Sequence, residues 1–324
     1  SFGPLGAKGF AFLNMLQLIG WTSIMIYDAM LALQELAPLS PMIWTIAIGA
    51  LVILWLFIGL HNTGYIQAIV SVLLLGLTLY MGAHMISQWP SEASLLSSGN
   101  MSFIAALELS IAMPLSWLPL ISDYTRESKN PVSASLTSAT VYTITSIVMY
   151  TLGLSAAIFG GGDSIITIMM NTGLGLAGLI VIIFSTVTTT FMDAYSAGVS
   201  STTIYNGASS KGVAVIVTMV GTIAAILYPM DDITDFLYLI GSVFAPMIAI
   251  LLADYFINRQ QVQTLSAYLV RGLIWAVSVG LYHYMLHSES TIGATLPAFT
   301  MAFVVTAIVG FISKTAHTSA EIKQ

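Results

Sequence analysis

The chain has 324 residues, of which 57% are hydrophobic and only 7% are Asp, Glu, Lys or Arg. A soluble domain carries about 25% charged residues, so this composition excludes an ordinary water-soluble globule and predicts a surface covered mainly by lipid. The absence of cysteine excludes disulfides and thiolate metal sites, and a net charge of -6 without a basic run argues against nucleic-acid binding. The chain begins at Ser1 without a signal-peptide pattern, and we expect that it is a fragment.

Ten apolar stretches follow one another along the chain, each close to the length that crosses a membrane. A helix needs about 20 apolar residues to span the hydrocarbon core. Helices are expected because every backbone donor must be satisfied inside the segment, and these runs are too long and too uniformly apolar for barrel strands. The predicted spans are 9–33, 42–60, 64–87, 101–122, 133–159, 174–203, 212–229, 234–257, 265–286 and 293–313.

The charges in the loops between these spans predict the orientation. With ten spans, all eight basic residues fall on one side of the membrane, and the loops on the other side carry only acidic residues. The basic residues are Lys8, Arg126, Lys129, Lys211, Arg259, Arg271, Lys314 and Lys323, of which Arg271 lies within the ninth span near its start on that same side. On the opposite side fall acidic residues such as Glu92, Asp163, Asp231, Asp232 and Glu289, with no Lys or Arg. The positive-inside bias therefore predicts that both ends of the chain are cytoplasmic.

Polar residues of the first span lie on one helical face. Asn14, Gln17, Trp21 and Asp28 are separated by three, four and seven residues. An amide, an indole and a carboxylate on one stripe are suited to a flat, hydrogen-bonding ligand. The alternative is helix packing through polar contacts, with Asp28 near the outer interface.

The fourth span carries Pro114 and Pro119. Each proline removes a helical donor and disfavours helix in the residue before it, so we expect a kink or a break near Ser116 and Trp117. Unwound backbone inside a membrane is found where it lines a protected cavity, as in transporters. A simple proline kink is the alternative.

Two acidic residues of this span are candidates for gating or proton coupling. Glu108 lies two turns before the expected break and is either a proton carrier or a member of a structural ion pair. Asp123, with Arg126, lies at the cytoplasmic end, where a gate or an anchor is expected rather than a substrate contact.

The sixth span contains a threonine run followed by an acid. Thr188, Thr189 and Thr190 offer the hard oxygen ligands that Na⁺ prefers, although threonine in membrane helices also commonly bonds its own i-4 carbonyl. Asp193 follows within one turn and is predicted to bind substrate or a coupling ion.

The remaining patterns do not favour an enzyme. His283 and His287 lie four residues apart at the outer end of the ninth span, where interfacial histidines are favoured over a metal site. Gly160, Gly161 and Gly162 are expected to form an extracellular turn. No catalytic spacing of His, Asp or Cys is present within the spans, and no catalytic residue is predicted.

Four stretches together resemble the nucleobase-cation-symport family. Gln17 to Trp21 resembles the family's third helix, and SDYTRESKNP resembles the end of the sixth, although Ser122 replaces the usual proline. TTTFMDAYSAG is similar to the eighth helix, and FLYLIGSVFAPMIAILLADYF is similar to the tenth. Among the subgroups, the chain resembles most the bacterial hydroxymethylpyrimidine and cytosine permeases.

This resemblance implies an all-α membrane protein with the five-plus-five inverted repeat of the LeuT type. The ten spans would be helices three to twelve, with the first two missing. Residues 1–324 would form a single transport domain, in which 9–87 is the remainder of the first repeat, 101–257 is the second repeat and 265–313 forms two additional helices.

The resemblance also implies roles for individual residues. Trp21 would stack on the substrate ring with Gln17 as a supporting amide, and Ser116 or Trp117 would contact the ring from the other side. Thr188 and Thr189 would bind Na⁺ in a sodium-coupled member. The coupling ion stays open between Na⁺ and H⁺, and no cofactor or further metal is expected.

Asp193 is the main departure from the family, whose members often place an Asn there to read an oxopyrimidine. An ionised carboxylate only accepts hydrogen bonds and therefore favours an exocyclic amine. We expect import of a pyrimidine, the thiamin precursor hydroxymethylpyrimidine, across the bacterial cytoplasmic membrane, without nucleic acid or an obligate protein partner. The alternatives are a cytosine, purine, other pyrimidine or allantoin permease of the same family and, more remotely, a channel or a non-transporting receptor.

Overall fold

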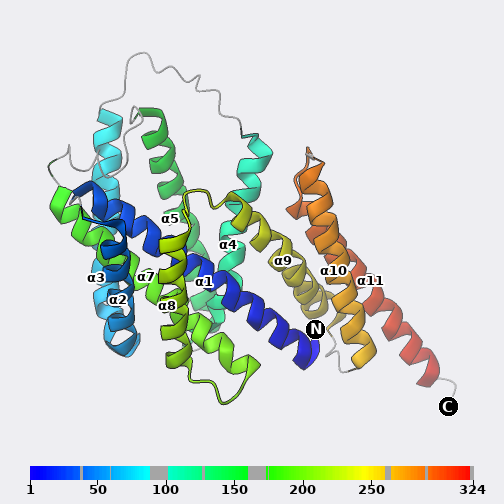
Figure 1. Cartoon of the computed structure of the whole chain (residues 1–324). Helices are drawn as coiled ribbons and strands as arrows, with labels where there is room; N and C mark the ends of the chain where they lie inside the picture. The colour runs from blue at the N-terminus through cyan, green and yellow to red at the C-terminus, as the bar shows by residue number, and fades with distance from the viewer. Residues whose placement is uncertain are drawn as a thin grey trace. The chain divides into compact units, whose positions relative to one another are not determined.

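The computed structural model describes residues 1–36, 39–58, 60–87, 101–125, 128–159, 173, 175–259, 264–288 and 291–321, and helices are the only regular secondary structure in this part of the chain (Figure 1). Ten of these helices are long and apolar enough to cross a membrane. They are α1 (Gly3–Leu36), α2 (Pro41–Ile58), α3 (Leu60–Ser87), α4 (Phe103–Thr125), α5 (Pro131–Phe159), α7 (Gly175–Ile204), α8 (Ser210–Leu227), α9 (Thr234–Leu252), α10 (Leu265–His287) and α11 (Thr295–Glu321). A π-helical turn, η1 (Ala253–Asn258), continues α9.

The ten predicted spans are confirmed as helices, and the largest differences lie at the two ends of the chain. α1 begins at Gly3 rather than at residue 9, and α11 continues to Glu321 rather than ending at 313. Hydropathy detects only the apolar part of a helix, whereas the backbone hydrogen bonds continue into polar flanks such as those around Lys8.

Polar side chains define where several helices begin. The Ser209 hydroxyl accepts a hydrogen bond from the Gly212 amide at 3.1 Å at the start of α8. At the start of α5, the Asn130 side chain accepts from the Ser133 amide at 3.1 Å, and Pro131 occupies the first helical position, where no donor is needed. The polar punctuation between the apolar stretches therefore includes true helix caps.

The chain divides into two compact units, each made of segments that are distant in sequence. Unit 1 comprises Ser1–Gln17, Asn100–Ile121 and Asp232–Gln324. Unit 2 comprises Leu18–Gly99 and Ser122–Asp231.

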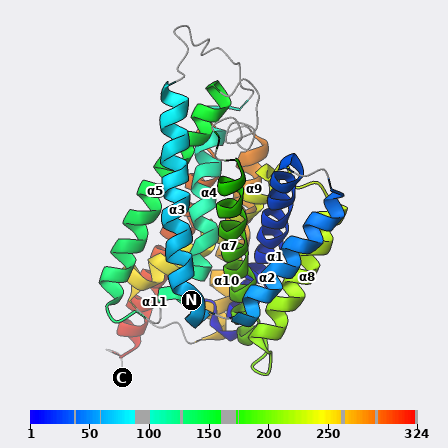
Figure 2. The same cartoon turned by 90° about the vertical axis from the view of Figure 1, so that its left-hand side faces the viewer.

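Unit 2 packs α2 against α7 and α8, and α3 against α5 and α7 (Figure 2). Small residues allow close approach: a Cβ added to Gly221 of α8 would lie 2.7 Å from the Thr22 methyl of α1, and one added to Gly198 of α7 would meet the Ser210 carbonyl. The buried apolar cluster of this unit consists of Ile26, Ala29, Ala32, Leu33, Ile48, Met81, Leu152, Leu179 and Ala225.

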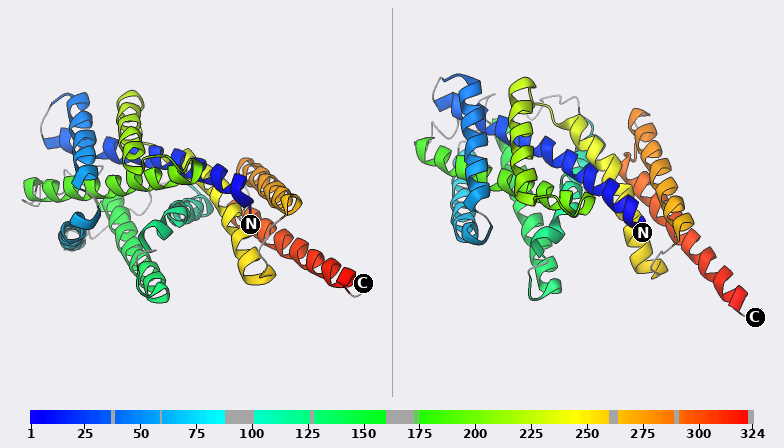
Figure 3. Two further views of the ribbon diagram at one scale, coloured as in Figure 1. Left: turned by 90° about the horizontal axis from the view of Figure 1, so that it is seen from below. Right: turned by 60° about the horizontal axis from the view of Figure 1, so that its bottom comes forward.

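In unit 1, α9 packs against both α10 and α11, and α10 and α11 lie side by side (Figure 3). One buried cluster comprises Ala249, Ile250, Ile274 and Ala302. The side chains of this cluster come from all three helices, so the C-terminal helices are held to α9 by apolar packing.

Of the kink or break expected in the fourth span, the break is wrong, because α4 is helical from Phe103 to Thr125 with Pro114 and Pro119 inside it. The Ser116 hydroxyl donates to the Met113 carbonyl at 2.6 Å, next to the first proline. Pro114 and Pro119 leave the Ser110 and Leu115 carbonyls without their usual i+4 amide partners, and the helix nevertheless continues past both prolines.

Several predicted features lie outside the described part of the chain. They are the side chain of Asp123, Arg126, the glycine turn at 160–162 and the loop residues Glu92, Asp163 and Glu289.

Candidate functional site

Gln17 and Ser116, predicted from two different spans, lie together in unit 1. The Gln17 Nε2 donates to the Asn14 Oδ1 at 2.7 Å and to the Ser116 backbone carbonyl at 3.0 Å. The Gln17 Oε1 is buried and accepts no hydrogen bond from the described residues. This carbonyl oxygen is therefore a buried acceptor suited to an N–H group of a ligand.

The neighbouring α4 side chains differ in their exposure. Ser116 is buried, and its hydroxyl donates a hydrogen bond to the Met113 carbonyl. Trp117, the next residue, is partly exposed. Glu108, two turns earlier, is also buried.

The structure gives Glu108 a role that sequence reasoning missed. Its carboxylate accepts hydrogen bonds from the backbone amides of Ala294 and Thr295 at 2.9–3.1 Å and from the Thr295 hydroxyl. These groups belong to the first turn of α11, so the carboxylate caps that helix. Among the described residues no cationic side chain pairs with Glu108, so the structural alternative takes the form of a helix cap rather than an ion pair.

In unit 2, the threonine run of α7 is bonded to its own helix. The hydroxyls of Thr188 and Thr189 both donate to the Ser185 carbonyl at 2.9 Å, and Thr190 donates to the Thr186 carbonyl at 2.7 Å. This is the local bonding that the sequence allowed as an alternative. A hydroxyl that donates keeps its oxygen lone pairs, so a cation can still be accepted by these oxygens.

Asp193 lies on the same helix, one turn after Thr189, and is only 5% exposed. It accepts no hydrogen bond and forms no ion pair with the described residues. A buried carboxylate without a partner is costly, and such groups mark ligand or ion sites in membrane helices. Trp21 of α1, in the same unit, is half-buried.

The outer residues of the predicted set have local roles. Asp28 is exposed, and the His287 ring nitrogen Nδ1 lies 2.7 Å from the His283 carbonyl. The described residues contain no group of three His, Asp or Glu side chains that could hold a metal ion.

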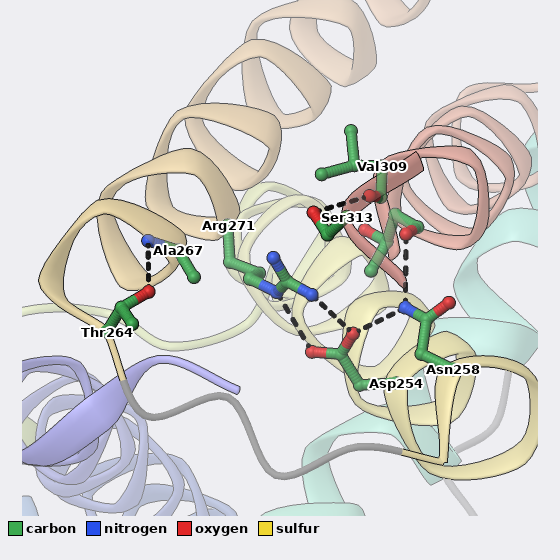
Figure 4. A network of polar contacts seen from close by, with 8 residues as sticks. Asp254, Asn258, Thr264, Ala267, Arg271, Val309 and Ser313 are labelled. Carbon is green, nitrogen blue, oxygen red and sulfur yellow. Dashed lines mark hydrogen bonds and ion pairs between the residues drawn. The ribbon is translucent and has the colours of Figure 1, made fainter. Parts of the chain in front are cut away.

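A buried ion pair in unit 1 was not predicted as a functional feature (Figure 4). The Arg271 Nε and Nη2 donate to the two carboxylate oxygens of Asp254 at 3.1 and 3.0 Å. The Asn258 amide also donates to Asp254, at 2.8 Å, and to the Thr306 carbonyl at 3.1 Å. The network joins η1, α10 and α11, and the signal that could have revealed it is a pair of opposite charges inside two consecutive predicted spans.

Comparison with known proteins assigns the family. The family described as "Permease for cytosine/purines, uracil, thiamine, allantoin" matches residues 2–322. The chain belongs to this family. The nucleobase-cation-symport resemblance of the sequence motifs is thereby confirmed, and the family is one of permeases rather than enzymes.

Individual relatives match more weakly. The cytosine permeases of Escherichia coli strains K12 and O157:H7 are each 25% identical over 185 residues, which are 56% of this chain and 44% of the permease. The chain thus matches less than half of the length of these relatives.

A solved structure has the same fold. Mhp1, a nucleobase-cation-symport-1 family transporter solved in a closed conformation with bromovinylhydantoin bound, matches with a TM-score of 0.75 at 17% identity. The match covers 94% of this chain and 76% of Mhp1. The all-α, LeuT-type membrane fold is confirmed, whereas the predicted limits of the repeats and the site residues stay predictions.

Proposed function

We propose that the protein imports an aminopyrimidine by cation-coupled secondary transport, with hydroxymethylpyrimidine as the first candidate. The observation that carries this proposal is Asp193, a carboxylate that is 5% exposed and has no hydrogen-bond donor among the described residues. An exocyclic amine supplies the missing donor, whereas the oxo groups of uracil or hydantoin would face the carboxylate with another acceptor. Membership of a permease family that includes cytosine, uracil and thiamine transport supports the substrate class.

A second candidate is cytosine, favoured by the match to the E. coli cytosine permeases. Cytosine also carries an amine next to a ring nitrogen, so Asp193 would serve either substrate. The remote alternative of a channel or receptor predicts no saturable, gradient-dependent uptake.

The deciding experiment is uptake of labelled hydroxymethylpyrimidine into cells that express the full-length gene product, with and without excess cytosine, at matched Na⁺ and pH. Saturable uptake that cytosine fails to block supports the first substrate. Full competition, together with uptake of labelled cytosine, transfers the assignment to cytosine. Absence of uptake of both compounds overturns the aminopyrimidine proposal.

The role of Asp193 is tested by Asp193→Asn, which keeps the size but loses the charge. We expect at least about a tenfold loss in uptake efficiency, because a hydrogen bond to a charged group is replaced by a weaker neutral one. Asp28→Asn removes an exposed carboxylate and is the matched control. Equal uptake by the Asp193 variant and the control would reject the proposed contact.

We also propose that Trp21 stacks on the ring, that the free Gln17 carbonyl oxygen accepts from a ring N–H, and that Ser116 or Trp117 contacts the ring. The buried Gln17 acceptor supports the second role. Gln17→Leu should raise KM for the transported substrate by about tenfold, and Trp21→Phe should raise it less than Trp21→Ala because an aromatic face is kept. Unchanged KM in these variants would remove the residues from the site.

For the coupling ion, we propose Na⁺ at Thr188 and Thr189, with H⁺ as the alternative. The lone pairs left on the two hydroxyl oxygens support this proposal. Thr188→Val and Thr189→Val should raise the Na⁺ concentration for half-maximal uptake, with Thr→Ser at each position close to the wild type. Uptake that depends on pH but not on Na⁺ would favour H⁺.

We propose that the protein lies in the bacterial cytoplasmic membrane with both ends of the chain cytoplasmic, as the loop charges predict. Because the chain has no cysteine, single cysteines can report the orientation. A membrane-impermeant maleimide should label Asp232→Cys in intact cells and Lys8→Cys only after permeabilisation, and the reverse pattern would overturn the orientation.

A further inference from the structure

We propose that Glu108 is a positioning residue for substrate binding: by capping α11, it fixes the segment of α4 that carries Ser116 and Trp117. This inference rests on the proposed function and assigns α11 a part in it. Glu108, the start of α11, Ser116 and Gln17 all lie in unit 1.

The contacts of Glu108 occupy both carboxylate oxygens. Oε1 accepts from the Ala294 and Thr295 amides at 3.1 Å each, and Oε2 accepts from the Thr295 amide at 2.9 Å and from its hydroxyl. The first amides of a helix have no partner within the helix and form its positive end. A carboxylate is the acceptor that such a helix start favours, but helices commonly obtain it from a residue next to their own start. Here it comes from a different helix, 187 residues away in sequence.

The surroundings leave space for this carboxylate and for little else. Gly293 has a φ of +77°, and a Cβ at this position would lie closer than 3.0 Å to the Glu108 carboxylate. Tyr282 of α10 is fully buried and packs with Ala294 and Ala298 at the same helix start. Its hydroxyl lies 2.8 Å from where a Cβ of Gly241 in α9 would be. Small residues therefore surround the contact between Glu108 and the start of α11.

The held segment is the part of α4 that is proposed to face the substrate. Ser116 lies eight residues after Glu108, about 12 Å along the helix axis. Pro114 and Pro119 remove two backbone donors on either side of Ser116, which weakens the helix where it bends most easily. Contacts with other helices help to fix its position, and they include Glu108 to the start of α11 and the Ser116 carbonyl to Gln17.

Proton coupling through Glu108, the other role that the sequence allows, stays a prediction.

The test compares Glu108→Gln, Thr295→Val and Thr295→Ser in the full-length protein. Gln keeps the shape but brings an N–H₂ group toward the helix start, Val removes only the hydroxyl, and Ser restores it. Ser110→Ala is the control, because Ser110 is exposed on α4 and its hydroxyl bonds only the Ala106 carbonyl of its own helix. We expect Glu108→Gln to raise KM about tenfold while the maximal rate per folded molecule changes less than about twofold, as lost positioning rather than lost turnover requires.

A second readout does not depend on transport. The chain has no cysteine, so Ser116→Cys can be labelled alone with a maleimide. Because Ser116 is 3% exposed, labelling should be slow, and it should accelerate several-fold when Glu108→Gln is added, as release of a buried segment predicts. Ser110→Ala should leave the labelling rate unchanged.

The outcomes separate the two proposals. If Glu108→Gln accelerates labelling of Ser116→Cys and raises KM, the positioning role is supported. If labelling accelerates but the protein takes up no pyrimidine, the positioning role is supported and the proposed substrate is rejected. Unchanged labelling and unchanged KM overturn the positioning role, as does a fall in maximal rate at constant KM. If Glu108→Gln does not accumulate in the membrane, the Thr295→Val and Thr295→Ser pair decides: equal KM and labelling in these two variants overturn the inference.

Discussion

Replacing Arg271 by Met should be one of the most destabilising single changes in unit 1. Arg271 is 4% exposed and Asp254 is 5% exposed, and the guanidinium donates two hydrogen bonds to the carboxylate, which also interacts with the Asn258 amide and the Ser1 side chain. Met keeps much of the volume of Arg but supplies no donor. The variant therefore leaves a buried carboxylate without its guanidinium partner.

The loss in the free energy of unfolding depends on which hydrogen-bond partner of Asp254 is removed. Removing one member of a buried ion pair costs about 3–5 kcal/mol of the free energy of unfolding, because the other charge stays buried. The Asn258 amide donates to the charged carboxylate, and a hydrogen bond of this kind is worth about 1.5–3 kcal/mol. Asn258→Ala should therefore cost about 2 kcal/mol, less than Arg271→Met. The double variant Asp254→Leu with Arg271→Met removes both charges and should cost less than Arg271→Met alone.

The assay is reversible unfolding of the purified protein by SDS in mixed micelles, followed by tryptophan fluorescence, with refolding checked for each variant. Arg259→Met is the control, because Arg259 is exposed at the end of η1, and its cost should stay within about 0.5 kcal/mol. A cost below about 1 kcal/mol for Arg271→Met would refute the reasoning, and so would a double variant whose cost equals the sum of the two single costs.

Three smaller predictions concern backbone and packing. Gly293→Ala should cost at least about 2 kcal/mol of unfolding free energy in the same assay, because its φ of +77° strains an L-residue and the added Cβ meets a carboxylate; a neutral effect would contradict the observed turn. Gly221→Val should cost about 1–3 kcal/mol, since its side chain would push against Thr22 across a close helix contact, whereas a stabilised variant would mean that the helices are not this close. A hydrogen bond with Thr234 lowers the pKa of Asp232 below 3.8, so its contribution to stability should be present above that pH and be lost as the pH falls through the lower folded value. The difference in Tm between wild type and Asp232→Asn measures this, and a difference that grows on acidification would have the wrong sign.

The membrane architecture could be predicted because it depends on length and polarity alone. A run such as 42–60 is recognised without knowledge of any partner, since lipid requires each helix to satisfy its own backbone. The ends of α1 and α11 could not be placed as well, because helix continues into polar residues that hydropathy counts as loop.

The backbone of the fourth span could not be predicted from its local sequence alone. Proline chemistry predicts a kink or a break in this turn, and the break does not occur. The Ser116 carbonyl between the two prolines accepts a hydrogen bond from the Gln17 amide, which lies 99 residues away in sequence. Such a distant contact leaves no signal near the prolines.

Glu108 could not be assigned for a related reason. The sequence predicts that Glu108 pairs with a cation or carries a proton, whereas its partners are mainly backbone amides at the start of α11. Backbone donors belong to every residue and leave no pattern in a sequence. The cluster Gly293, Ala294 and Thr295 at the start of an apolar span is the nearest available signal, since a helix start needs an acceptor.

The structure separates three buried carboxylates by what they bind. Glu108 receives four hydrogen bonds at the start of α11, and Asp254 receives three from Arg271 and Asn258, so both are satisfied by the protein itself. Asp193 is equally buried, at 5% exposed, and receives none from the described residues. Burial without a partner costs several kcal/mol, which a stable membrane helix tolerates where a ligand or an ion supplies the missing donor for part of the time. Removing the carboxylate at Asp193 should therefore raise stability while uptake falls, the opposite of the result expected at Glu108 and Asp254, where stability falls with the charge.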